Sequence, residues 1–245
     1  MTLMKSLVAA FAFLTRLPVW RGPLRDADLG RSVSFFPLVG LVLGFGLTGT
    51  AAALSGHLSP WLVAVLLATV LAALTGALHL DGVADVFDAL GGGRGDRVRM
   101  LEIMRDSRIG AHGGTALTLL LIAKVAALAE VAARQDLLAL LAAPTIARWL
   151  AAVLVVMFPY ARPDGLGRAF NGEAGRLQVA AATGIAVVVV GVLGPALILP
   201  ALGAAAVVLG FGFWLYRRLG GLTGDVYGAA IELAEVVMLM LCCVR

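Results

Sequence analysis

Seven apolar segments, most of them close to 20 residues long, dominate the chain and limit what it can fold into. A membrane-spanning helix needs about 20 predominantly apolar residues, and this chain is 61% hydrophobic with a mean hydropathy of +0.98. Only 14% of its residues are charged, against about 25% in soluble domains. These features predict an all-α, polytopic helical bundle of about seven spans that forms a single membrane-embedded domain over residues 1–245. The expected spans are 33–54, 60–78, 110–132, 137–158, 178–199, 201–216 and 226–244.

Some apolar segments do not fit a simple span. The sixth is short, and only Pro200 separates it from the fifth, so these two are expected to form a tight hairpin or a broken element. Residues 6–14 are too few to cross a bilayer, and we expect an interfacial or re-entrant helix there. Cys242 and Cys243 are adjacent in an apolar segment, which argues against a disulfide framework and a zinc site.

The basic residues are distributed unevenly among the loops. The N-terminal segment and the loops after the second, fourth and sixth spans hold 15 of the 19 Lys and Arg residues, whereas the opposite side holds only Arg134 and Arg245. Because cytoplasmic loops carry the excess of Lys and Arg, the N-terminus and the 79–109 loop are predicted to be cytoplasmic. Lys124 and Arg148 lie inside spans, where a charge faces protein or a water-filled cavity. The net charge of +4 forms no basic patch interleaved with aromatic residues, so no nucleic-acid partner is expected.

An acidic stretch between the second and third spans, residues 79–114, holds six of the 15 acidic residues. Asp81, Asp85 and Asp88 are spaced i, i+4, i+7, which places their carboxylates on one helical face within about 60° of each other. Their mutual repulsion favours a bound cation, and an oxygen-only ligand set favours Mg²⁺. The alternative is a solvated acidic helix start that interacts with the helix dipole, although this does not explain the acid at i+7.

A second acidic helix start lies on the same predicted side of the membrane. Asp225 and Glu232 are seven residues apart at the beginning of the last span, with Glu232 two turns inside it. An unpaired carboxylate at that depth is costly, so Glu232 is expected to meet a metal, an arginine or a proton. This second acidic helix start indicates a site shared with Asp81, Asp85 and Asp88, in which Asp225 or Glu232 completes the metal ligands.

Glycines and arginines follow the first acidic group. Gly91 and Gly92 belong to a glycine-rich turn whose N–H groups could approach an anion closely, although such glycines also act as plain hinges. Asp96 is expected to cap a short cytoplasmic amphipathic helix over 97–106. The arginines expected to contact phosphate oxygens are Arg105 and Arg108 after that helix, and Arg162 and Arg168 in the loop between the fourth and fifth spans.

Several segments of the chain resemble the sequence signature of the cobalamin synthase family, the adenosylcobinamide-GDP ribazoletransferases. The two longest are HLDGVADVFDALGG at 79–92 and EIMRDSRIG at 102–110. Shorter ones are FLTRLP at 13–18, FPLVG at 36–40, GLG at 165–167 and GLTGDVYGAA at 221–230. These segments are distributed over nearly the whole chain, in the order of the family pattern. Two positions differ from that pattern, because Val83 and Ala230 stand where it has Leu and Asn.

The resemblance implies an Mg²⁺-dependent enzyme of the bacterial inner membrane with its active site on the cytoplasmic side. Such an enzyme transfers the cobinamide-phosphate part of adenosylcobinamide-GDP onto α-ribazole, or α-ribazole 5′-phosphate, and releases GMP. It forms adenosylcobalamin, or its 5′-phosphate, by in-line attack on a pyrophosphate. The implied partners are the corrinoid and nucleoside substrates and the lipid bilayer, and homo-oligomerisation stays open.

The roles expected for the candidate residues follow from that chemistry. In-line phosphoryl transfer needs neutralised charge and accurate placement more than covalent help. Arg105 and Arg108 are expected to hold the pyrophosphate or GMP, with Asp106 orienting one of them, and Asp88 is the preferred general base. The expected metal ligands are Asp81, Asp85 and Asp88, completed by Asp225 or Glu232.

Two other functions compete with this interpretation. A CDP-alcohol phosphotransferase also places several aspartates at cytoplasmic helix ends, but Asp85 stands where that pattern has an arginine. An ion or metal transporter would use Lys124, Arg148 and Glu232 as intramembrane pathway residues. A transporter should show its acids near the bilayer midplane in two matching halves, and the chain shows no internal repeat.

Overall fold

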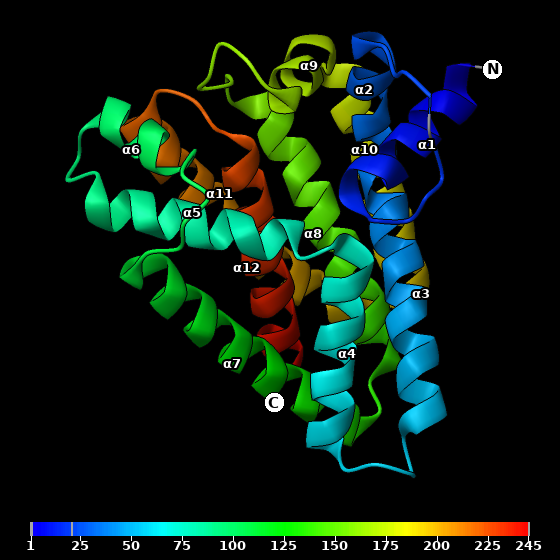
Figure 1. The fold of residues 1–245 in the computed structure, drawn as a ribbon. Coiled ribbons are helices and arrows are strands. Elements are labelled where there is room, and N and C mark those ends of the chain that lie inside the picture. Colours follow the sequence, from blue (N-terminus) through cyan, green and yellow to red (C-terminus); the bar gives the residue numbers. More distant parts are fainter. Residues whose placement is uncertain (1, 21, 245) are drawn as a thin grey trace.

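The computed structural model describes residues 2–20 and 22–244, and every regular element in this part of the chain is a helix. Most of the long helices run lengthwise through one bundle, and short helices gather at one end of it (Figure 1). The elements are α1 (Thr2–Leu14), α2 (Asp26–Ser32), η1 (Val33–Phe35), α3 (Phe36–Leu54), α4 (Pro60–Thr75), α5 (Leu78–Gly92), α6 (Arg97–Ile103), α7 (Ala111–Arg134), α8 (Leu137–Met157), α9 (Leu166–Glu173), α10 (Arg176–Leu193), η2 (Pro195–Leu197), α11 (Ile198–Leu219) and α12 (Gly224–Cys242).

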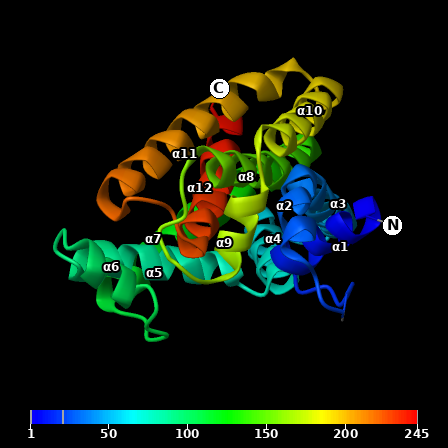
Figure 2. The same cartoon turned by 90° about the horizontal axis from the view of Figure 1, so that it is seen from above.

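Fewer helices are long and apolar enough to span a membrane than the seven that the sequence predicts. Five stretches are long and apolar enough to cross a membrane, and α4 with α5 makes a sixth if the bent pair is one span. This confirms a polytopic helical membrane protein. The helix α12 is not among the five because it carries three acidic residues, yet it lies in the middle of the bundle, packed against α5, α7, α8 and α11 (Figure 2). The five are Asp26–Leu54, Ala111–Arg134, Leu137–Met157, Arg176–Leu193 and Pro195–Leu219.

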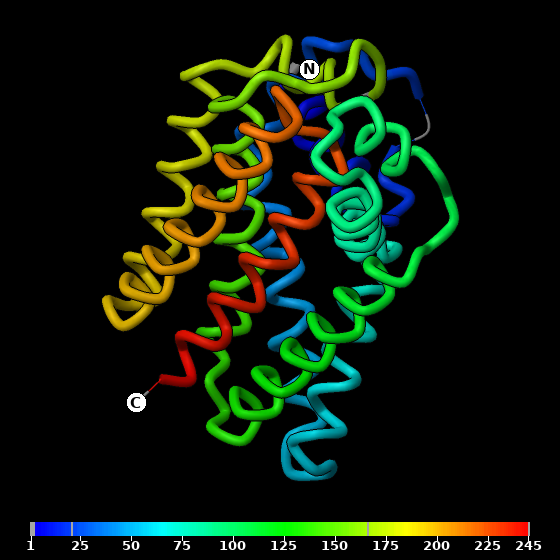
Figure 3. The backbone as a smooth tube through the Cα atoms, turned by 90° about the vertical axis from the view of Figure 1, so that its left-hand side faces the viewer, coloured from blue at the N-terminus to red at the C-terminus, as the bar shows by residue number. Residues whose placement is uncertain are grey.

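The second expected span is shorter than predicted and ends in a sharp bend. Gly76 and Ala77 both adopt positive φ, at +63° and +56°, which stops α4 and turns the chain by 90° into α5. Helices commonly end at a residue whose backbone adopts the left-handed conformation. As a result α5 lies across the bundle instead of along it, and Figure 3 shows it nearly end-on while α3, α8 and α12 run lengthwise.

The break between the fifth and sixth apolar segments was placed wrongly at Pro200. The chain turns at Gly194, whose φ is +123°, and continues through η2 into α11. Pro200 lies in the first turn of α11, where a helix does not need the missing N–H. The sixth element is therefore a full helix of 22 residues and not a short remnant.

Two kinds of contact hold the centre of the bundle together. Gly40 and Gly44 on α3 let the backbone of α8 approach so closely that an added Cβ would meet main-chain atoms at Pro144 and Leu141. Lys124 on α7 and Arg148 on α8 are both buried and reach carboxylates of α12. Small residues and buried polar pairs are the usual means of helix association inside a bilayer.

Candidate functional site

The candidate site forms where α5 crosses the beginning of α12. A Cβ added at Gly82 would lie 2.5 Å from the carbonyl oxygen of Asp225, and one at Gly228 would lie 3.2 Å from the Cα of His79. These two glycines let the backbones of the two helices come into near contact. The crossing brings acidic residues of α5 next to Asp225, which lies in the first turn of α12 behind the capping residue Thr223.

Asp81, Asp85 and Asp225 form one electrostatic cluster at this crossing. Partial burial and the negative charges of Asp81, Asp225 and Asp88 together raise the pKa of Asp85 to about 7, although Arg162 opposes the shift. No hydrogen bond or ion pair within residues 2–20 and 22–244 engages the carboxylate of Asp81 or Asp85. The cluster therefore has more negative charge than its protein neighbours neutralise.

Arg162 is the one predicted phosphate ligand that the structure brings to these acids. Its Nη2 donates to Oδ2 of Asp225 at 2.8 Å, and the Thr223 hydroxyl donates to the same oxygen at 3.2 Å. The loop before α9 is held in place because the N–H of Ala161 donates to the carbonyl of Leu222 at 2.8 Å. Arg168 is not part of the cluster, since its guanidinium donates to the carbonyl of Pro163 on the exposed loop.

Asp88 has a different environment from the other two acids of α5. Its two carboxylate oxygens accept hydrogen bonds from the backbone N–H groups of Gly110 and Gly113, at 2.6 and 2.8 Å. These donors are among the unpaired N–H groups at the start of α7, so Asp88 caps that helix from a neighbouring element. Its expected place among the metal ligands and as general base is therefore not supported by its contacts.

Glu232 lies in the bundle interior and not with the acids of α5. Its Oε2 accepts a hydrogen bond from Nζ of Lys124 at 2.7 Å, and Nζ of Lys124 also lies 2.5 Å from Glu235. Glu235 in turn pairs with Arg148. The prediction that Glu232 completes the metal site is wrong on this geometry, because its carboxylate has a buried cationic partner one helix away. The buried positions of Lys124 and Arg148 are explained in the same way, because each of these two cations pairs with a carboxylate of α12.

The arginines after α6 lie on exposed segments outside the acid cluster. Nη2 of Arg105 pairs with Asp164 at 2.7 Å, and the guanidinium of Arg108 contacts both oxygens of Asp106, the closest at 2.6 Å. The hydrogen bonds from Arg108 lower the pKa of Asp106 to about 2. Asp96 caps α6 as predicted by accepting from the N–H groups of Val98 and Arg99.

The glycines that were candidates for anion binding serve helix packing instead. The ring of His112 lies directly against Gly91, and the side chain of Ile103 lies 3.0 Å from where a Cβ would stand at Gly92. Neither glycine has a positive φ. Gly91 and Gly92 therefore let α5 pack closely against α6 and the start of α7.

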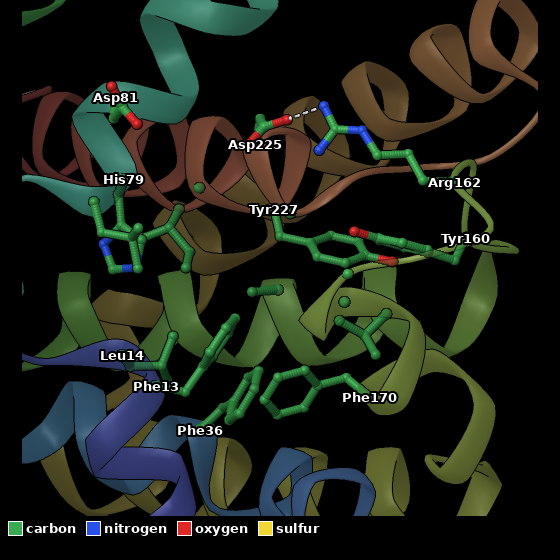
Figure 4. A pocket seen from close by; sticks show the side chains of 18 residues that line it. Phe13, Leu14, Phe36, His79, Asp81, Tyr160, Arg162, Phe170, Asp225 and Tyr227 are labelled. Atoms are coloured by element: carbon green, nitrogen blue, oxygen red, sulfur yellow. Dashed lines mark hydrogen bonds and ion pairs between the residues drawn. The ribbon is translucent and has the colours of Figure 1, made fainter. Parts of the chain in front are cut away.

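A cavity of about 250 Å³ opens beside the acid cluster. Asp81, Arg162 and Asp225 line it together with an aromatic group, and Figure 4 shows these charged side chains above the aromatic rings. This aromatic lining was not predicted from the sequence. The one signal in the sequence is position, because Tyr160 and Tyr227 each lie two residues from a candidate site residue, Arg162 and Asp225. The aromatic residues are Phe13, Phe36, Tyr160, Phe170 and Tyr227.

The donor set of the site suits a hard divalent cation in part. Within the described residues no group of three or more His, Cys, Asp or Glu side chains is arranged to hold a metal ion. Mg²⁺, however, usually takes only one or two carboxylates and keeps waters and substrate phosphates as its other ligands. Asp81 and Asp85 are unpaired oxygen donors that meet this requirement, and Asp225 lies beside them.

Comparisons with known proteins agree over nearly the full length of the chain. The family model described as cobalamin-5-phosphate synthase matches residues 6–243. A Geotalea daltonii protein named adenosylcobinamide-GDP ribazoletransferase is 45% identical, with 94% of each chain aligned. Proteins of the same name from Klebsiella pneumoniae and Escherichia coli are 43% and 42% identical, covering 97% and 95% of this chain and 99% and 96% of theirs. No solved structure matches the chain.

Proposed function

Because the chain belongs to the cobalamin-5-phosphate synthase family, we propose that it transfers the cobinamide-phosphate part of adenosylcobinamide-GDP to α-ribazole, or to α-ribazole 5′-phosphate, and releases GMP. The observation that carries this proposal is the acid cluster of Asp81, Asp85 and Asp225, because Asp81 and Asp225 line a largely apolar cavity. Attack on an anionic pyrophosphate needs positive charge at the reacting phosphorus, and an apolar nucleoside base needs a dry cavity beside it.

The transfer is a displacement at phosphorus. A ribose hydroxyl oxygen of the nucleoside forms a bond to the cobinamide-side phosphorus of the pyrophosphate, and the bond from that phosphorus to the bridging oxygen of GMP breaks. GMP carries away the electron pair of that bond, and the hydroxyl proton passes to a carboxylate of the cluster. Arg162 borders the cavity and can move from Asp225 to a phosphate oxygen, because a guanidinium matches either anion in the same forked geometry.

We propose Asp81 and Asp85 as the residues that hold Mg²⁺, with Asp225 beside them. Bound there, Mg²⁺ would neutralise charge on the pyrophosphate as the phosphorus is attacked. Asp88 and Glu232 are left out because their carboxylates are engaged by the start of α7 and by Lys124.

We also propose that the enzyme lies in the bacterial inner membrane with this site on the cytoplasmic side. The basic loops support this orientation, since 15 of 19 Lys and Arg residues belong to the segments at the end of the bundle that carries α1, α2, α6 and α9. Apolar side chains such as Val187, Val188 and Val192 on α10 are exposed and suit contact with lipid.

The test is a turnover assay on the full chain in lipid. Adenosylcobinamide-GDP, α-ribazole and Mg²⁺ should give GMP and a corrinoid product in equal amounts, and a chelator should stop both. CDP-diacylglycerol offered as the donor should give no product, in line with the family match, which favours neither the CDP-alcohol phosphotransferase nor the transporter. Absence of GMP under all of these conditions would refute the proposed function.

A further inference from the structure

The cavity beside the acid cluster is lined by side chains that suit a flat, apolar ring. Phe13 on α1, Phe36 on α3 and Phe170 on α9 contact one another, with ring centroids 4.3 Å apart for Phe13 and Phe170 and 5.9 Å for Phe36 and Phe170 (Figure 4). Ala151 and Val155 on α8 also line the cavity. Aromatic walls favour stacking with a planar ligand.

Two polar side chains in this lining have no partner within the described residues. His79 is 2% exposed and both of its ring nitrogens lack a hydrogen bond, and Tyr227 is 5% exposed with an unpaired hydroxyl. Nearly all buried polar atoms in proteins are paired, and an unpaired one is costly. Since both residues line the cavity, a ligand bound there could supply the missing partners.

The size of the cavity limits which substrate group can enter it. Its volume of about 250 Å³ is below the range of about 300–1,000 Å³ common for drug-sized ligands. A corrin macrocycle is far larger than such a ligand, so it cannot be enclosed here. A single bicyclic base can.

The polarity of the lining then distinguishes the two bases of the reaction. Guanine carries three N–H donors and a carbonyl along one side, whereas most of the residues that line the cavity are apolar or aromatic. Leaving such groups unpaired on binding is strongly unfavourable. The base of α-ribazole is 5,6-dimethylbenzimidazole, an apolar bicyclic ring with two methyl groups and one free ring nitrogen that accepts a single hydrogen bond. His79 and Tyr227 are both able to donate one.

The geometry points to this cavity as the binding site for the base of the nucleoside substrate, with His79 and Tyr227 as residues that determine which base is accepted. This inference rests on the proposed function and adds the position of one substrate to it. A base stacked against the wall formed by Phe13, Phe36 and Phe170 has its ribose in the same cavity that Asp81 and Asp225 line. The hydroxyl that reacts is then next to the carboxylates.

A series of nucleosides tests the inference on the unaltered protein. α-Ribazole is compared with the α-linked ribosides of unsubstituted benzimidazole and of guanine, with GMP release as the measurement. Removal of the methyl groups should raise KM for the nucleoside about 10-fold or more, as expected for lost apolar contacts. The guanine riboside should not be used. Equal KM values for all three nucleosides would overturn the inference.

A variant that fills the cavity provides a second test. Ala151→Leu places added methyl groups in the cavity and should raise KM for α-ribazole about 10-fold without changing KM for adenosylcobinamide-GDP. The matched control is Ala186→Leu, because Ala186 lines a separate apolar cavity between α8, α10 and α11. A rise in KM for adenosylcobinamide-GDP instead, or no change in either KM, would show that the base binds elsewhere.

A conservative variant tests the polar contact without risk to the fold. Tyr227→Phe removes only the hydroxyl and should raise KM for α-ribazole about two- to ten-fold, the effect of one hydrogen bond. Tyr216→Phe makes the same change on α11, outside the cavity, and should leave KM unchanged. Unchanged KM in Tyr227→Phe would remove this residue from base recognition.

Calorimetry separates a failure of this inference from a failure of the proposed function. Titration of the detergent-solubilised protein with α-ribazole alone should show binding that Ala151→Leu weakens about 10-fold. If GMP release is absent but this binding is seen, the cavity assignment stands and the reaction is wrong. If GMP is released but α-ribazole binding is equal in Ala151→Leu and the unaltered protein, the reaction stands and the cavity assignment is wrong.

Discussion

At the scale of single residues, acids with regular helical spacing have different surroundings and therefore different roles. Asp81 and Asp85 lie near Asp225, and no Lys or Arg among residues 2–20 and 22–244 pairs with them, while Asp88, one turn further on, accepts two backbone hydrogen bonds at the start of α7. The spacing places all three on one side of α5. What each carboxylate does depends on the element that comes next to it.

Substitution by asparagine should separate these roles. Asp85→Asn removes a charge that the proposed chemistry needs and should lower kcat by about 100-fold or more, while the free energy of unfolding at neutral pH should rise, because the ionised carboxylate is partly buried beside other acids. Asp88→Asn leaves one of the two N–H groups facing an amide NH₂ and should lower the free energy of unfolding by about 1 kcal/mol, with a much smaller loss of kcat. GMP release and unfolding in mixed micelles measure the two effects. The reverse pattern would return Asp88 to the active site.

The buried charges of the bundle interior give a second prediction at this scale. Arg148 is fully buried and pairs with Glu235, which also meets Lys124. Arg148→Met removes one partner of a buried ion pair and should lower the free energy of unfolding by about 3–5 kcal/mol. Arg134→Met breaks an exposed pair with Glu130 and should change it by at most about 1 kcal/mol. Equal changes in the free energy of unfolding for the two variants, measured by SDS titration, would show that the buried pair stabilises the bundle no more than the exposed pair does.

At the scale of elements, the position of α5 decides where the acids lie. Because α5 crosses α12 at Gly82 with almost no space between the backbones, any side chain at this position must push the two helices apart. The acids of α5 and Asp225 would then separate as well. The close crossing of α5 and α12 is therefore what brings Asp81 and Asp85 next to Asp225.

Gly82→Ala should therefore affect stability and activity together. Its Cβ would lie 2.5 Å from the carbonyl oxygen of Asp225, and overpacking of this kind costs about 1–3 kcal/mol. Turnover should fall at the same time. Gly184→Ala is the matched control, because it lies on α10 with nothing within 4 Å of an added Cβ, and it should stabilise the helix by up to about 1 kcal/mol. Unfolding and GMP release are measured for both, and indistinguishable behaviour would contradict the close crossing.

The parts of this architecture that could be predicted from the sequence are those with local causes. The apolar segments gave the helices, and Asp96 gave the start of α6, because hydropathy and capping depend on neighbouring residues. The 90° turn after Thr75 and the break at Gly194 depend on backbone conformations that several residues could adopt. The partners of Asp88 and Glu232 come from α7, which is distant in sequence, so spacing alone could not separate these two acids from Asp81 and Asp85.

At the scale of the whole molecule, the charged end of the bundle and the cavity lie on the same side. The segments that hold 15 of the 19 Lys and Arg residues lie at the same end of the bundle as the crossing of α5 and α12, and the connections after α3, α7 and α10 and the end of α12 lie toward the other end (Figures 1 and 3). A nucleotide-linked substrate made in the cytoplasm reaches the site directly in this orientation.

Thiol labelling on intact cells stripped of their outer membrane tests the orientation. In a protein with Cys242 and Cys243 replaced by serine, Ser107→Cys lies on the exposed segment between α6 and α7, and His57→Cys lies in the connection between α3 and α4. Since the loops rich in Lys and Arg stay in the cytoplasm, a membrane-impermeant maleimide should label His57→Cys at once. It should label Ser107→Cys only after the membrane is permeabilised. Labelling of both variants after permeabilisation confirms that each thiol is reactive. Immediate labelling of Ser107→Cys with protection of His57→Cys would place the acid cluster outside the cell, where no nucleotide-linked substrate could reach it from the cytoplasm.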